Sequence, residues 1–136
     1  MTPITIEAHI AADIQKVWDY WTKPEHITKW NFASDDWHCP SAQNDLRVGG
    51  TYSARMEAKD GSFGFDFAGT YTKIEPEKLI AYDFGDRAAV VEFLAAADGV
   101  NVRVTFDAEA QNSVDMQRGG WQAILDNFAR YVEGRK

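Results

Sequence analysis

The 136-residue chain has room for one domain, and its 45% hydrophobic content suffices for a single core without a disulfide or a structural metal. Its 21 acidic and 14 basic residues give a net charge of -7, which disfavours nucleic acid or an anionic membrane as a partner. No apolar run approaches the roughly 20 residues of a membrane-spanning helix, and the first residues do not resemble a signal peptide. The single cysteine, Cys39, suits a reducing compartment. We therefore expect a cytoplasmic protein.

The N-terminal part predicts one strand followed by two short helices. Residues 4–10 alternate between apolar and polar side chains, as in a half-buried strand. Asp13 is placed as the N-cap of a helix, and Thr22, which precedes Lys23 and Pro24, as the cap of a second helix that ends near Trp30. The apolar positions that recur at helical spacing in the first helix are Ile14, Val17, Trp18 and Trp21.

Residues 31–45 have neither helical nor strand periodicity and predict a long loop. The loop carries Phe32 and Trp37, two large rings that could close one end of a cavity. Its titratable residues, which could suggest a metal or a Cys-His nucleophile, are Asp35, Asp36, His38 and Cys39. Adjacent His and Cys lack the separated spacing of metal ligands, so we prefer a packing role and predict neither a metal nor a cofactor.

Asp60-Gly61 lies between two alternating runs and predicts a β-hairpin with a two-residue type I′ turn. In that register the numbers of paired residues sum to 121. One face then carries the apolar pairs, and the opposite face carries Arg55 across from Asp66. The residues on the apolar face are Tyr52, Ala54, Met56, Ala58, Phe63, Phe65 and Phe67, with Gly69 opposite Tyr52.

Asp98-Gly99 predicts a second hairpin, in which paired numbers sum to 197 and Phe93 faces Val104. The charged and polar residues of this hairpin fall on the other face: Glu92, Arg103, Thr105 and Asp107. Between the hairpins, Ile80, Tyr82 and Phe84 alternate in a further strand. The sheet is therefore expected to contain about six antiparallel strands or more.

The last predicted element is a long helix with Ser113 as its cap. Its apolar stripe consists of Val114, Trp121, Ile124, Leu125, Phe128 and Val132. Strands followed by a terminal helix predict an α+β fold, with an antiparallel sheet that curves around the helix.

Four segments resemble one known family. They are I-x-A-x-I-A-A-D-I-x-K-V-W-x-x-W-T-x-P-E-x-I-x-x-W at 6–30, D-L-R-V-G-G-T-Y at 45–52, G-T-Y-T-K-I-E-P-E-K-L-I at 69–80 and G-W-Q-A-I-L-D-N-F at 120–128. Together they resemble homologues of the activator of the heat-shock protein 90 ATPase, within the START-like (SRPBCC, birch-pollen-allergen-like) superfamily. The resemblance implies one START-like domain over residues 1–136 and a helix-grip fold with a cavity between sheet and C-terminal helix. It also makes a chaperone a candidate partner.

Aromatic residues make up 13% of the chain, and the predicted registers direct many of their rings toward the inner face of the sheet. A concave face lined by rings, with few polar groups, is typical of a site for a small apolar molecule. We therefore predict a binding protein rather than an enzyme, for a small hydrophobic or aromatic ligand. The predicted ligand-binding residues are Trp37, Tyr52, Met56, Phe65, Phe67, Tyr82 and Trp121.

Two other functions remain open at this point. A cyclase- or hydrolase-like enzyme would need Tyr52, His38 or an inward-turned pair of Arg55 and Asp66 at the cavity, because acid-base catalysis requires positioned titratable groups. A chaperone-linked interaction module would bind through its surface instead. A homodimer is a further candidate assembly, since symmetric dimers are the commonest oligomers.

Overall fold

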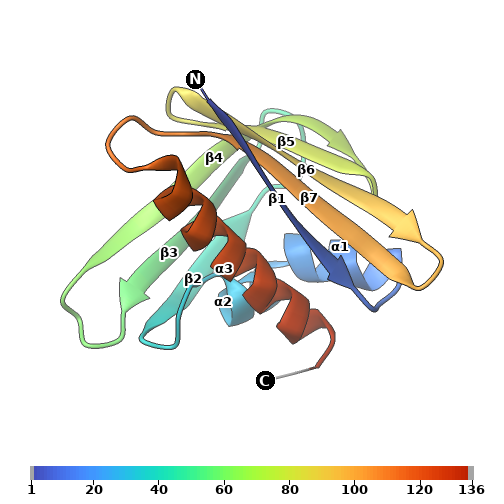
Figure 1. The fold of residues 1–136 in the computed structure, drawn as a ribbon, viewed down its shortest axis with the longest axis horizontal. Helices are drawn as coiled ribbons and strands as arrows, with labels where there is room; N and C mark the ends of the chain where they lie inside the picture. The colour runs from blue at the N-terminus through green and yellow to red at the C-terminus, as the bar shows by residue number, and fades with distance from the viewer. Residues whose placement is uncertain (1, 135–136) are drawn as a thin grey trace.

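The computed structural model describes residues 2–134 and contains seven strands and three helices in that range (Figure 1). In chain order the elements are β1 (Pro3–Ile10), α1 (Ile14–Thr22), α2 (Pro24–Trp30), β2 (Trp37–Asn44), β3 (Thr51–Ala58), β4 (Gly64–Glu75), β5 (Leu79–Phe84), β6 (Arg87–Ala96), β7 (Gly99–Asp107) and α3 (Val114–Val132). All strand pairs are antiparallel, in the order β1-β7-β6-β5-β4-β3-β2. The sheet curls into a half-barrel, and α3 lies across its inner face (Figure 1). The predicted α+β fold is confirmed.

The register predicted for the first hairpin is confirmed, but its turn is not of type I′. Arg55 pairs with Asp66 and Tyr52 with Gly69, as expected from a sum of 121. A type I′ turn needs positive φ at both central residues, and here Gly61 has φ +78° whereas Asp60 does not lie in that region. The Ala58 amide instead donates to the Phe63 carbonyl across a longer loop. Lengthening the loop symmetrically from two to four residues leaves the register unchanged.

The second hairpin is shifted by two residues from its predicted register. Phe93 pairs with Val102 rather than with Val104, and the strands end at the pair Ala96 and Gly99. The shift has a physical cause at Gly99, where an added Cβ would lie 2.1 Å from the Ile10 carbonyl oxygen. This glycine therefore permits close packing against the end of β1, and the turn lies just before it. Because the shift is two residues, every side chain keeps its predicted face.

The predicted loop at residues 31–45 is wrong for most of its length, because β2 occupies Trp37–Asn44 and pairs with β3. The strand has no regular alternation because its register shifts between His38 and Ser41, around Pro40. Proline is accommodated at such a bulge and on an edge strand, and β2 is an edge of this sheet. With β2 the sheet has seven strands, in agreement with the expected six or more.

The helix caps agree with the prediction at two of three positions. The side chain of Asp13 accepts a hydrogen bond from the Lys16 amide at 2.9 Å, and that of Ser113 from the Met116 amide at 3.1 Å. Thr22 is not the cap of α2, since it is the last residue of α1 and its hydroxyl donates to the Trp18 carbonyl. The cap of α2 is Lys23, with Pro24 as the first helical residue.

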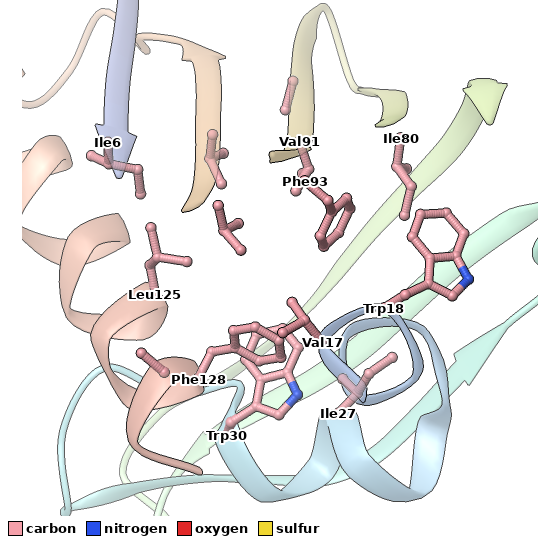
Figure 2. Close-up of a cluster of buried hydrophobic side chains, with 14 of the residues drawn as sticks. Ile6, Val17, Trp18, Ile27, Trp30, Ile80, Val91, Phe93, Leu125 and Phe128 are labelled. Carbon is pink, nitrogen blue, oxygen red and sulfur yellow. The ribbon is translucent and has the colours of Figure 1, made fainter. Parts of the chain in front are cut away.

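A solid core fills the end of the sheet beside α1 and α2. Figure 2 shows side chains from α1, α2, α3 and the sheet converging there. The ring of Phe128 is fully buried and packs edge-on against Trp21 and Trp30, with ring centroids 5.0 and 4.8 Å apart. No helix among the described residues is long and apolar enough to cross a membrane. At the other end of the space between the sheet and α3, the side chains leave a cavity.

Candidate functional site

A cavity of about 380 Å³ lies between the sheet and α3. Its wall is formed by α1, α2, β1, β3 to β7, the segment that follows β7, and α3. The lining residues are Ile6, Trp21, Trp30, Asn31, Tyr52, Met56, Phe65, Phe67, Tyr71, Ile80, Tyr82, Arg87, Val104, Glu109, Asn112, Met116, Gln117, Gly120, Trp121, Ile124 and Leu125. The space is therefore large enough for a small organic molecule and mostly apolar.

Six of the seven residues predicted to bind a ligand line this cavity: Tyr52, Met56, Phe65, Phe67, Tyr82 and Trp121. Their role in binding stays a prediction. Trp37 does not line the cavity and instead contacts the rings of Phe63 and Phe65, with centroids 5.9 and 6.1 Å away. This differs from the predicted position because Trp37 belongs to β2, where it pairs with Ala58 near the tip of the first hairpin.

Four aromatic side chains of the lining, Tyr52, Phe67, Tyr82 and Trp121, are connected by ring contacts. The ring of Trp121 stacks on Phe106, with centroids 3.7 Å apart and planes 7° from parallel. It also lies 6.2 Å from Phe67 and 5.8 Å from Phe84. On the other side, Phe67 contacts Tyr52 and Tyr82 at 6.2 and 6.3 Å. The rings thus extend from α3 across β4 and β5 to β3.

One hydrogen-bonded pair of polar side chains in the lining joins the C-cap of α2 to β3. Asn31, which is 4% exposed, donates through its side-chain amide to the Tyr52 hydroxyl at 2.7 Å. Burial raises the pKa of Tyr52 well above its ordinary value, and burial likewise raises the pKa of Tyr82. Both hydroxyls therefore keep their protons at neutral pH and can donate hydrogen bonds.

A second polar group lies where α3 begins. The Arg87 guanidinium stacks over the Phe84 ring at 4.5 Å and lies 3.9 Å from the Glu109 carboxylate. Gln117 accepts from the Glu109 amide at 2.7 Å and donates to the Asn112 carbonyl at 2.8 Å. These bonds hold the segment between β7 and α3 against the helix. Arg87 and Glu109 are the only charged residues of the lining in the part of the chain that the structure describes.

Sequence reasoning missed all of these polar residues except the two tyrosines. Gln117 could have been found, since it lies four residues before Trp121 and eight before Leu125, on the apolar stripe of α3. A polar residue on such a stripe indicates a specific hydrogen-bonding role. Asn31 carries no comparable local signal, because its position depends on the packing of α2 against β3.

The charged residues proposed for an enzyme lie outside the cavity. Arg55 pairs with Asp66 at 3.6 Å and with Glu57 at 2.8 Å, and His38 lies 3.6 Å from Glu57. None of these four lines the cavity, whereas Tyr52 does. Within residues 2–134 no cluster of three or more His, Cys, Asp or Glu side chains could hold a metal ion. Apart from the Arg87 and Glu109 pair, the cavity therefore offers neutral hydrogen-bonding groups and rings.

Comparison with known proteins gives a family match over nearly the whole chain. Residues 11–133 match the model of the family described as Activator of Hsp90 ATPase homolog 1-like protein. None of the curated proteins matches the chain.

Several solved structures are similar. The AHSA1-like protein from Aeromonas hydrophila is 46% identical, with a TM-score of 0.93 over 98% of this chain and 93% of that one. Chr148 from Cytophaga hutchinsonii is 47% identical, with a TM-score of 0.83 over 96% and 92% of the two chains. CV1439 from Chromobacterium violaceum shares the fold at 21% identity, with a TM-score of 0.84 over 96% of each chain.

Proposed function

The chain belongs to the family of Activator of Hsp90 ATPase homolog 1-like proteins, and we propose that it binds a small apolar or aromatic molecule in the cavity between its sheet and α3. The observation that supports this proposal is the cavity of about 380 Å³ itself. A core of this size is normally packed to crystal-like density, with few voids larger than a water molecule. A space many times larger than a water molecule, lined mostly by apolar and aromatic side chains, is suited to a ligand.

The surroundings of the cavity support binding rather than acid-base chemistry. The two charged residues of the lining pair with each other, and burial keeps the tyrosine hydroxyls protonated. A general base that could remove a proton near neutral pH would need to be close to the substrate with a pKa near the working pH. A neutral, ring-lined cavity can hold an aromatic molecule by stacking and by burial of its apolar surface.

The test is a titration with N-phenyl-1-naphthylamine, an uncharged probe whose fluorescence rises in apolar surroundings. We expect saturable binding of one probe per chain. Trp121→Ala should weaken it by about tenfold, because the probe loses an aromatic contact worth on the order of 1.4 kcal/mol. Phe63→Ala is the matched control, since that ring is 62% exposed and does not line the cavity. Lack of saturable binding to the wild-type chain would contradict the proposal.

A chaperone-linked interaction is the second candidate function. The description of the family refers to activation of the Hsp90 ATPase. Trp37, Phe63 and Phe65 form an exposed cluster of contacting rings at the tip of the first hairpin, with Phe63 and Phe65 62% and 40% exposed. Measuring the ATPase rate of purified Hsp90 with added wild-type chain or Phe63→Ala tests this candidate. We expect the wild-type chain to raise the rate and Phe63→Ala to raise it less. An unchanged rate with the wild-type chain would count against this candidate.

A further inference from the structure

The Tyr82 hydroxyl is a polar group of the cavity that the fold does not use. Tyr82 is only 9% exposed, lines the cavity, and has no hydrogen-bond partner among residues 2–134. No fully buried side-chain oxygen or nitrogen among the described residues lacks a partner, so this hydroxyl must be open to water. The space that reaches it is the cavity. A buried tyrosine usually finds a partner for its hydroxyl, and here the fold provides none.

The position of Tyr82 is held by its neighbours rather than by its hydroxyl. Its ring lies against Gly69 of β4, where an added Cβ would be 2.9 Å from the Tyr82 Cδ2 atom. Rings on either side, Tyr71 at 6.4 Å and Phe84 at 5.7 Å, restrict the side chain further. The hydroxyl is thus presented to the cavity at a fixed place.

Tyr52 presents a second donor nearby. Its ring centroid is 6.5 Å from that of Tyr82. Its oxygen already accepts a hydrogen bond from the Asn31 amide, so the group that remains available is its own O–H. No acceptor for that proton exists among the described residues. Asn31 is the C-cap of α2, and its position is held by its backbone N–H, which donates to the Ile27 carbonyl at 3.1 Å.

The charges of the lining determine which acceptor fits. Among residues 2–134, Arg87 is the only cation of the lining, and it is already engaged by the Asp107 carbonyl at 2.9 Å, by the Phe84 ring and by Glu109. A carboxylate placed at Tyr52 and Tyr82 would lose its hydration and could gain only Arg87 as a counterion, which it would have to share with Glu109. An uncharged oxygen loses much less and gains one or two hydrogen bonds.

We propose that Tyr52 and Tyr82 form a hydrogen-bonding subsite for an uncharged oxygen acceptor of the ligand, such as the carbonyl oxygen of an aryl ketone. The inference rests on the proposed binding function and adds the chemical class of the ligand: an aromatic body that carries a neutral carbonyl, rather than a hydrocarbon or an organic acid.

The test uses three ligands of the same ring system, each measured by displacement of N-phenyl-1-naphthylamine. They are 2-acetylnaphthalene with a ketone, 2-ethylnaphthalene without an acceptor, and 2-naphthoate with a carboxylate. We expect the wild-type chain to prefer the ketone to both others. Tyr82→Phe should weaken the ketone about three- to tenfold, which is the range for one neutral hydrogen bond, and leave 2-ethylnaphthalene within twofold.

Two further measurements separate a ligand contact from a structural role. Because the Tyr82 hydroxyl has no hydrogen-bond partner among residues 2–134, Tyr82→Phe should leave the thermal stability of the free chain unchanged. Tyr131→Phe is the matched control, since its hydroxyl lies 2.7 Å from the His26 Nδ1 atom and outside the cavity lining. The infrared C=O band of bound 2-acetylnaphthalene should move to higher frequency in Tyr82→Phe and stay unchanged in Tyr131→Phe.

Equal affinities of the wild-type chain for the ketone and the ethyl compound, with no change in Tyr82→Phe, would overturn this inference while leaving the proposed function intact. Tighter binding of the carboxylate than of the ketone would overturn it as well. Lack of saturable probe binding to the wild-type chain would contradict the proposed function itself, and the inference with it.

Discussion

Replacing Gly120 by leucine should make the protein more stable and its binding weaker at the same time. Gly120 lies inside α3 and lines the cavity, and an added Cβ would meet no atom within 4 Å. A glycine inside a helix costs about 0.5–1 kcal/mol relative to alanine, and leucine is close to alanine in helix propensity. The variant should therefore melt about 2–4 °C higher, as expected for a domain of this size.

The same side chain should occupy the space that the ligand needs. We expect Gly120→Leu to weaken N-phenyl-1-naphthylamine by tenfold or more in a fluorescence titration, since about 1.4 kcal/mol of lost contact suffices for that factor. Loss of binding together with a higher melting temperature could not be ascribed to unfolding. This separates the variant from truncations such as Trp121→Ala, which remove core contacts as well.

Gly119→Leu provides the matched control. Gly119 is the neighbouring helical glycine, also has no atom within 4 Å of an added Cβ, and does not line the cavity. Adjacent helical residues point about 100° apart, so this leucine should stabilise α3 without entering the cavity. Unchanged binding in Gly120→Leu, or equal weakening in both variants, would refute the reasoning that a ligand lies beside this turn of α3.

Three further predictions concern the core, the buried tyrosines and the thiol. Phe128→Ala should lower the free energy of unfolding by about 3–5 kcal/mol in urea denaturation, because the ring is fully buried; a loss below about 1 kcal/mol would contradict this packing. Burial raises the folded-state pKa of Tyr52 and Tyr82 above the unfolded-state value near 10. Their contribution to the free energy of unfolding is therefore complete below about pH 10 and is lost as the pH rises further, because the unfolded chain then releases these protons more readily. Thermal scans from pH 8 to 11 should show stability falling above about pH 10, less steeply in Tyr82→Phe. The buried Cys39 thiol, whose pKa burial raises, should react with a thiol reagent only as fast as the chain opens; rapid, complete labelling of the native chain would exclude this.

The faces of the two hairpins could be predicted from the sequence because side-chain direction alternates with a period of two. A four-residue loop in place of a two-residue turn at Gly61, and a two-residue shift at Gly99, both preserve that alternation. The exact pairing of the second hairpin could not be predicted, since it depends on the approach of Ile10 to Gly99 from the far end of the chain. Local turn signals contain no information about such a contact.

At the candidate site, too, sequence periodicity predicted the strand residues, whereas contacts between separate elements could not be predicted. Rings on the inner faces of β3, β4 and β5 follow from alternation, and the structure places them around the cavity. Strand β2 was missed because its bulge at Pro40 removes the alternation, and Trp37 was misplaced with it. Asn31 and Arg87 reach the cavity only through the packing of separate elements. The apolar part of the lining was therefore predictable from periodicity, and its hydrogen-bonding groups mostly were not.

The pairing of β1 with β7 bears on how the chain folds. Ile4 pairs with Phe106, so the first strand finds its neighbour only after about a hundred intervening residues have been made. Contacts of such long sequence separation slow folding, and α3, which covers the inner face, follows all seven strands in the chain. During synthesis the ring-bearing face of β3 to β5 is thus without its cover. A nascent chain in that condition is prone to aggregate, and a ligand or helper protein that shields these rings would raise the yield of folded protein.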